Sequence, residues 1–290
     1  MFHRTGKSAT DADLAYDAAQ RVVDAHRHLA GFIRAGMTLT QIDAEVAKVL
    51  RAMGCESCFY RYSPPRSGLP PFPNHACLSV NECVVHGTSV YHTAPLRPGD
   101  LLKIDIGVFC QRMVGDAAWT YSIGEPTPEV RRLMDVGKES LRRGLAALNA
   151  GMRWRDWAAE VERCVEREAG YRLVSGLGGH GYGKGRLHGA PYVANTLEPY
   201  WDDREKPCSP GTLVALEPMI AVGTRENITG LEHLRANGTM VPTHMEKLHK
   251  WPIISADGSL TVHYEADVLV LEGGIRDLTA GLADVPDVVG

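Results

Sequence analysis

The sequence lacks the features of a membrane-spanning, secreted or nucleic-acid-binding protein. No run of apolar residues approaches the ~20 that cross a bilayer. The first ten residues are polar and contain no apolar segment of the kind found in secretory signals. The formal net charge is −4, without any block of like charges, so no basic surface for nucleic acid is expected. We therefore expect a cytoplasmic protein with no membrane or nucleic-acid partner. Nothing in the sequence indicates assembly, and a monomer is the default expectation.

Cysteine is also scarce, with seven residues in a chain of 290. An odd number of cysteines, in a chain too long to need disulfides for stability, argues against a disulfide framework. Cys55 and Cys58 form a CxxC pair, but no second CxxC or nearby CxxH completes a zinc site. We expect all seven cysteines to be free thiols in a reducing compartment.

The pattern of apolar residues predicts a mixed helix-and-strand protein. Length and composition (44% hydrophobic, 23% charged) fit one domain over residues 1–290, with halves near 11–125 and 126–275. Helices are predicted at 11–34, 40–53, 127–149 and 154–169, and strands near 77–85, 101–110, 114–123, 172–178, 212–217 and 260–271. The proline-rich stretch 55–75 is predicted to be a long binding loop. His26 and His28, two apart on the first helix, are interpreted as surface residues.

Two pairs of segments in the chain resemble each other. Residues 35–46 match 150–161 at six of twelve positions, and each segment opens a helix after a glycine. Residues 98–105 match 210–217, and an acid stands seven residues after the proline in both. Chance similarity between two amphipathic helices is the alternative, but the matching acids favour a duplication. In a duplicated fold, Asp105 and Glu217 would face each other across a pseudo-two-fold axis.

Four acids lie inside apolar strand-like runs: Asp105, Asp116, Glu217 and Glu265. A buried carboxylate is costly unless it is paired or binds a cation. Strand alternation puts each acid on the less apolar face of its strand, and His180 follows in a glycine-rich stretch that would let the backbone approach a ligand closely. Oxygen ligands with one imidazole suit two ions of Mn²⁺, Fe²⁺, Co²⁺ or Zn²⁺. The alternative is scattered surface acids and one loop histidine.

Six short motifs, taken in this order, resemble those of the type I methionine aminopeptidases. They are Ser79–Gly87 (SVNECVVHG), Pro98–Asp105 (PGDLLKID), Gly115-Asp116, Gly179–Gly183 (GHGYG), Glu217-Pro218-Met219 and Tyr264-Glu265. The resemblance covers roughly residues 10–275. It implies the "pita-bread" fold, an α/β (α+β) architecture of duplicated helix–helix–strand halves with a curved antiparallel sheet covered by helices.

The resemblance also implies roles for the five acid and histidine residues. Asp105 and Asp116 would bind two divalent metal ions, with Asp116 bridging them. His180 and Glu217 would complete one metal site, and Glu265 would bridge. Glu217 would also carry a proton from the attacking water to the leaving amine.

Further residues would contact the substrate in such an enzyme. His86 would lie at the scissile peptide, and His188 would polarise the carbonyl and stabilise the oxyanion. An apolar pocket for the methionine side chain would be lined by Cys77, Phe72, Leu187 and Trp251. For Trp251 the alternative is an ordinary core aromatic.

The implied activity is hydrolysis of the N-terminal methionine from peptides and nascent proteins, through a hydroxide held by two metal ions. A proline-specific relative, an X-Pro aminopeptidase or prolidase, shares the ligands but generally carries an extra N-terminal domain, whereas helices here begin near residue 11. A binding relative without activity should have lost a ligand, and none is lost.

The chain departs from the family pattern around its second histidine. His180 and His188 are eight residues apart instead of the usual seven, and Gly189-Ala190 replaces an acidic pair. Leu187 stands where phenylalanine is usual. The stretches 60–73 and 223–250 are also unusual. The placement of His188 and the substrate preference are therefore the points that a structure must address.

Overall fold

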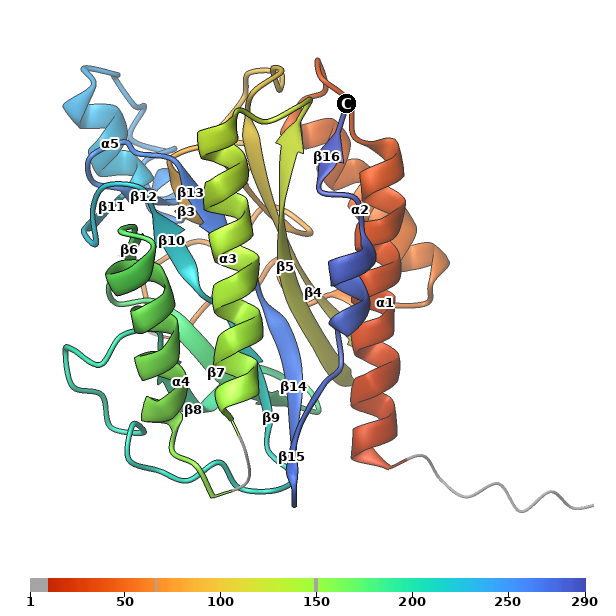
Figure 1. Ribbon diagram of the computed structural model, residues 1–290. Coiled ribbons are helices and arrows are strands. Elements are labelled where there is room, and N and C mark those ends of the chain that lie inside the picture. The colour runs from red at the N-terminus through yellow and green to blue at the C-terminus, as the bar shows by residue number, and fades with distance from the viewer. Residues whose placement is uncertain (1–9, 66, 149–150) are drawn as a thin grey trace, which may run out of the picture.

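Helices and strands alternate along the chain in the computed structural model, which describes residues 10–65, 67–148 and 151–290 (Figure 1). The helices are α1 (Asp11–Phe32), α2 (Leu39–Ala52), α3 (Pro128–Ala147), α4 (Trp154–Glu162), the π-helix η1 (Arg163–Glu168), α5 (Gly230–Ala236) and the 3₁₀ turns η2 (Leu248–Lys250) and η3 (Ala280–Asp284). The strands are β1 (Glu56–Ser57), β2 (Cys77–Val80), β3 (Cys83–Val85), β4 (Leu101–Cys110), β5 (Met113–Ile123), β6 (Arg172–Leu173), β7 (Gly178–Gly183), β8 (Arg186–Ala194), β9 (Leu213–Leu216), β10 (Met219–Ala221), β11 (Asn227–Thr229), β12 (Ile253–Ser255), β13 (Thr261–His263), β14 (Ala266–Leu271), β15 (Gly274–Asp277) and β16 (Val288–Val289).

Two five-stranded sheets form the frame of the molecule, and α1, α3 and α4 stand over the strands (Figure 1). One sheet has the order β1-β4-β5-β16, with β2 also paired to β4, and the other has the order β15-β14-β9-β7-β8. All of these pairings are antiparallel except β16 with β5. Among the described residues, no helix combines the length and apolar character needed to cross a membrane.

Helix α1 covers one face of the β4–β5 hairpin and leaves the other face free for the site. Thr10 caps the N-terminus of the helix: its hydroxyl accepts from the Asp13 N–H while the Asp13 carboxylate accepts from the Thr10 N–H. Its apolar side packs on β5 so closely that a Cβ atom at Gly115 would lie 2.6 Å from the carbonyl carbon of Ala18. Because strand side chains alternate, Asp116, Thr120 and Ser122 of β5 face away from α1.

The two repeated segments begin equivalent elements in the two halves. Strands β4 and β9 begin three residues after Pro98 and Pro210. The following glycines make matching bonds, since Gly99 N–H donates to the Ile123 carbonyl at the end of β5 and Gly211 N–H to the Val270 carbonyl in β14. Helices α2 and α4 likewise begin at matching positions, although Ala150, the first residue of the second segment, lies outside the described residues, as do residues 1–9.

Several predicted elements differ in detail from the structure. The strand predicted at 77–85 is divided into β2 and β3 by a turn at Asn81, whose φ is 51°. The strand predicted at 260–271 is interrupted at Tyr264-Glu265. The glycine-rich stretch that begins at residue 178 forms the β7–β8 hairpin. Strand propensity could not predict this hairpin, because glycine is a poor strand former.

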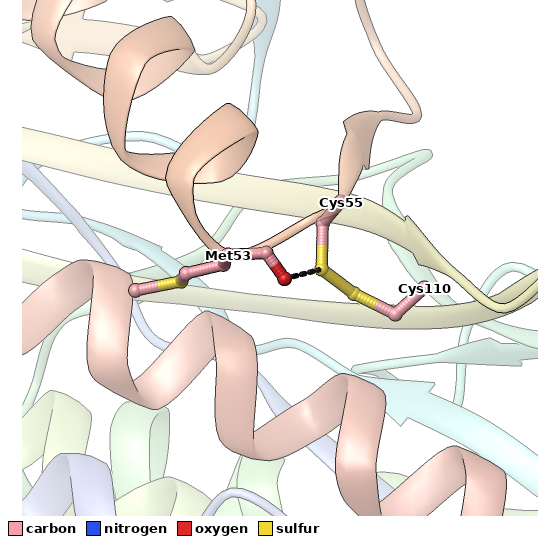
Figure 2. The surroundings of a disulfide bond; sticks show 3 residues. All are labelled: Met53, Cys55 and Cys110. Atoms are coloured by element: carbon pink, nitrogen blue, oxygen red, sulfur yellow. Dashed lines mark hydrogen bonds between the residues drawn. A yellow bond between two sulfur atoms is a disulfide. The ribbon is translucent and has the colours of Figure 1, made fainter.

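The expectation that all cysteines are free is wrong for two of them. Cys55 and Cys110 form a disulfide that joins the turn after α2 to the end of β4 (Figure 2). The pairing of β1 with β4, Glu56 opposite Phe109, brings the two Cα atoms to 4.8 Å. This contact depends on strand register between residues 55 apart, which composition does not encode. Cys58, Cys77, Cys83, Cys164 and Cys208 are free.

The interpretation of His26 as a surface residue is also wrong. Its side chain is fully buried beneath α1, where Nδ1 lies 2.9 Å from the Tyr121 hydroxyl and Nε2 lies 3.2 Å from the Ala117 carbonyl oxygen. Burial lowers the pKa of His26 to about 4, so the ring is neutral. His28 is exposed as expected and contacts Glu45 at 2.8 Å.

Candidate metal centre

All eleven predicted site residues line one cavity of about 250 Å³. The five expected metal ligands form its floor, and the six expected substrate residues form its walls. The floor consists of Asp105, Asp116, His180, Glu217 and Glu265, and the walls include Phe72, Cys77, His86, Leu187, His188 and Trp251. The cavity lies where β4, β5 and β7 meet the ends of β9 and the start of β14.

Asp105 and Asp116 come from the β4–β5 hairpin. Asp105 is opposite Ala118 and Asp116 is opposite Gly107, so the two acids are diagonal neighbours on one face. The backbone N–H of Asp116 donates to Oδ2 of Asp267 at 2.8 Å, which ties β5 to β14. The predicted alternation of the strands therefore places these two side chains together.

Two overlapping groups of side chains have the spacing of metal ligands. Within each group the nearest ligand atoms lie within 4.8 Å of one another. One group is Asp116, His180 and Glu265, and the other is Glu217, His263 and Glu265. Nε2 of His180 is 3.7 Å from Asp116 Oδ2 and 3.9 Å from Glu217 Oε1, so the groups adjoin.

Burial and mutual repulsion raise the pKa of all four floor carboxyls. For each of them burial is the larger cause, and the charge of a neighbouring carboxylate adds to it, as Glu217 does for Asp105 and Asp116 does for Glu217. Burial and then the charge of His188 lower the pKa of His180 to about 3, so its ring is neutral. Positive charge nearby would keep carboxyls crowded in this way ionised.

Unpaired oxygen atoms show where that charge would bind. Among the described residues, no hydrogen bond reaches the buried Oδ1 atoms of Asp105 or Asp116. A buried polar atom without a partner is rare in folded proteins and requires an explanation. Carboxylate oxygens together with neutral imidazole form a donor set that suits divalent first-row metal ions. The residues present therefore fit such a cofactor.

The cavity wall is aromatic and apolar. Phe72 and Trp251 make an edge-to-face contact with centroids 5.1 Å apart, and Trp251 stands edge-to-face to His86 at 6.1 Å. The indole N–H of Trp251 donates to the Pro70 carbonyl at 3.0 Å, which fixes the ring. Trp251 is thus both a buried aromatic and part of the cavity surface.

His86 and His188 line the cavity from opposite halves of the chain. His86 follows β3 with a φ of 55°, in the left-handed region that residues with side chains adopt uncommonly. The His188 ring is 4.4 Å from that of His180. The β7–β8 ladder near the two histidines is irregular, with register shifts after His180 and after Gly181.

Five further residues at the site were not among the predicted ones. Phe59, Tyr62 and Pro64 of the 55–75 loop line the cavity, and the prediction of a binding loop had not singled out any of them. His263 places Nε2 3.2 Å from Glu217 Oε2. His263 and Asp267 share the strand face of Glu265, and that alternation was the signal that could have identified both.

The chain matches one protein family and is similar to several known proteins in sequence and in structure. Residues 13–272 match the model of metallopeptidase family M24. The chain is 31% identical to methionine aminopeptidase 1 of Mycobacterium tuberculosis, over 95% of the chain and 94% of that protein. It is similar in structure to the methionine aminopeptidase of Thermotoga maritima, with a TM-score of 0.78 at 26% identity, covering 94% of the chain and 98% of that structure. The fold also resembles the Xaa-Pro dipeptidase of Bacillus anthracis, with a TM-score of 0.65 at 19% identity. That match covers 94% of the chain but 61% of the dipeptidase structure.

Proposed function

Because the chain belongs to metallopeptidase family M24 and, within it, to the methionine aminopeptidases, we propose that it removes the N-terminal methionine from peptides and nascent proteins by metal-dependent hydrolysis. The observation that carries the proposal is the cavity in which a floor of carboxyl and imidazole side chains meets an apolar wall. Such a cavity can place the bond after an apolar first residue against the metal centre.

Asp105, Asp116, His180, Glu217 and Glu265 would hold two divalent metal ions of cobalt, manganese, iron or zinc. Glu265 belongs to both ligand groups, which supports a bridging role, and Asp116 lies close to His180 in the first of them. When bound, such a metal pair supplies a water of lowered pKa and a Lewis acid that polarises the peptide carbonyl.

The side chains around the ions would position the substrate and move its protons. Burial, with a smaller effect of the charge of His188, lowers the pKa of His86 to about 4, and burial also lowers that of His188. Both rings are therefore neutral and can each donate one N–H to the peptide. Oε2 of Glu217 lies 3.2 Å from Nε2 of His263, a contact that would orient this carboxyl to transfer a proton to the leaving amine.

The methionine side chain would enter the apolar part of the cavity. Phe59, Phe72, Leu187 and Trp251 supply aromatic and aliphatic surface, and Cys77 adds a small sulfur-containing side chain. A flexible thioether suits such a wall, because sulfur packs favourably against aromatic rings. Hydrolysis would then release free methionine and a shortened chain.

Newly made polypeptides would be the main partners, and a cytoplasmic location is part of the proposal because nascent chains emerge there. Disulfides are uncommon in that compartment. Burial of Cys55 and Cys110, which are 7% and 9% exposed, would slow reduction of the disulfide by soluble thiols.

Competing peptides test the proposal. The metal-loaded protein should release methionine from Met-Ala-Ser faster than it cleaves Xaa-Pro dipeptides, measured as kcat/KM by amino-acid analysis. Faster cleavage of Xaa-Pro dipeptides would refute the methionine assignment in favour of a proline-specific peptidase.

A further inference from the structure

The 55–75 loop is fastened to the cavity at several points. The Cys58 N–H donates to the Gly107 carbonyl of β4 at 2.8 Å. Further along the loop, Arg61 N–H donates to the Phe72 carbonyl and Phe72 N–H donates to the Tyr62 carbonyl, at 2.9 and 2.8 Å. These bonds fold the loop back on itself and fix the backbone of Tyr62 beside the cavity, in addition to the disulfide at Cys55.

The side chain of Tyr62 reaches across the cavity to β8. Its hydroxyl lies 2.8 Å from Nδ1 of His188, a residue 126 positions further along the chain. The two rings are 5.3 Å apart and tilted by 57°, so the hydroxyl meets the ring edge where Nδ1 lies. Tyr62 and His188 both line the same cavity as the metal-binding side chains.

The direction of this hydrogen bond is set by the tautomer of His188. A tyrosine hydroxyl is protonated at neutral pH and can donate, and a neutral imidazole has one nitrogen that accepts and one that donates. When Tyr62 donates to Nδ1, the ring proton of His188 must lie on Nε2. The second nitrogen of a functional histidine is commonly held in this way, which sets both its tautomer and its orientation.

We infer that Tyr62 is a positioning residue that holds His188 in the Nε2–H tautomer, aimed at the carbonyl oxygen of the scissile bond. The inference rests on the proposed function, because it deepens the role of His188 there. Tyr62 acts through His188 in this account, and the loop thereby contributes to the chemistry as well as to the wall of the pocket.

Kinetics of matched tyrosine variants test this role. Tyr62→Phe keeps the aromatic surface and removes the hydroxyl, and it should lower kcat for Met-Ala-Ser by about 5- to 50-fold, with KM within about twofold and metal content unchanged. Tyr60→Phe is the control, since Tyr60 is in the same loop, is 42% exposed, and has no hydrogen bond from its hydroxyl among the described residues. It should retain wild-type kinetics.

A double-mutant cycle separates positioning from a direct effect. In a His188→Ala background, Tyr62→Phe should cause no further loss of kcat, because the group it positions is gone. An equal loss in both backgrounds, or wild-type kcat in Tyr62→Phe alone, would overturn the inference.

The tautomer can also be read without any turnover. In the zinc-loaded protein, ¹⁵N NMR of the histidine rings should show His188, identified by the signals missing in His188→Ala, protonated on Nε2. Tyr62→Phe should shift its Nδ1 resonance, whereas Tyr60→Phe should not. A His188 ring protonated on Nδ1, or one that does not respond to Tyr62→Phe, would contradict the inference. Absence of methionine release from the wild-type protein, with the NMR result intact, would instead refute the proposed function.

Discussion

The floor and the wall of the cavity are built in different ways. Two of the floor carboxylates, Asp105 and Asp116, come from the long buried strands β4 and β5, and Asp116 is 2% exposed. The wall comes in large part from the 55–75 loop, whose single short strand is β1 and which is held by a disulfide and scattered backbone bonds. Rigid strands can fix charged ligands, whereas a loop adjusts the fit of a substrate. Substitutions in the floor should therefore abolish activity and metal binding together, whereas substitutions in the wall should lower activity by degrees.

The largest effect is expected from Asp116→Ala in the floor. The substitution removes an anionic ligand that lies near both His180 and Glu265, so methionine release should fall more than ~10³-fold and bound metal should be lost. Metal analysis by mass spectrometry, activity, and circular dichroism to verify folding check this. A folded variant that keeps metal and activity would remove Asp116 from the centre.

The disulfide joins the two regions, and its removal should cost global stability. Replacing Cys55 and Cys110 with serine together frees a loop that spans 55 positions, and should lower the free energy of unfolding by about 2–4 kcal/mol. Chemical denaturation of the double variant and the wild type measures this, with Cys208→Ser, at a buried free cysteine, as the control. Equal loss in control and double variant would mean that the bond contributes nothing beyond packing.

His26 supports the floor from behind, and it should make stability depend on pH. Its pKa is about 4 in the folded protein against about 6.5 unfolded, so the unfolded state binds the extra proton between these values. The contribution of the neutral His26 ring to the free energy of unfolding is fully present above pH ~6.5. It falls by about 3 kcal/mol as the pH drops to ~4. Denaturation of His26→Gln across this range should show a shallower slope than the wild type, and identical slopes would show that the ring is not buried in neutral form.

A graded loss is expected when the wall is trimmed at Trp251. Trp251→Ala removes the edge-to-face contact with Phe72 and the bond to Pro70, so kcat/KM for Met-Ala-Ser should fall by about 10- to 100-fold while bound metal is unchanged. Kinetics with metal analysis check this. Loss of metal together with activity would show that wall and floor are not separable.

The same contrast explains what the sequence could and could not predict. The two-residue period of 101–110 and 114–123 predicted β4 and β5 and the shared face of Asp105 and Asp116, because alternation is local. The Cys55–Cys110 bond and the Tyr62–His188 contact could not be predicted, since both depend on how distant segments come together. The glycines of the β7–β8 hairpin give no strand signal, so the hairpin was not predicted. The burial of His26 was not predicted because the sheet covers a broad surface of α1.

Anomalous diffraction from crystals grown with Mn²⁺ tests the central claim, which is a two-metal centre on the floor of the cavity. Two manganese peaks should lie ~3.5–4 Å apart among Asp105, Asp116, His180, Glu217 and Glu265. No peak there, or peaks only on other residues, would contradict the account.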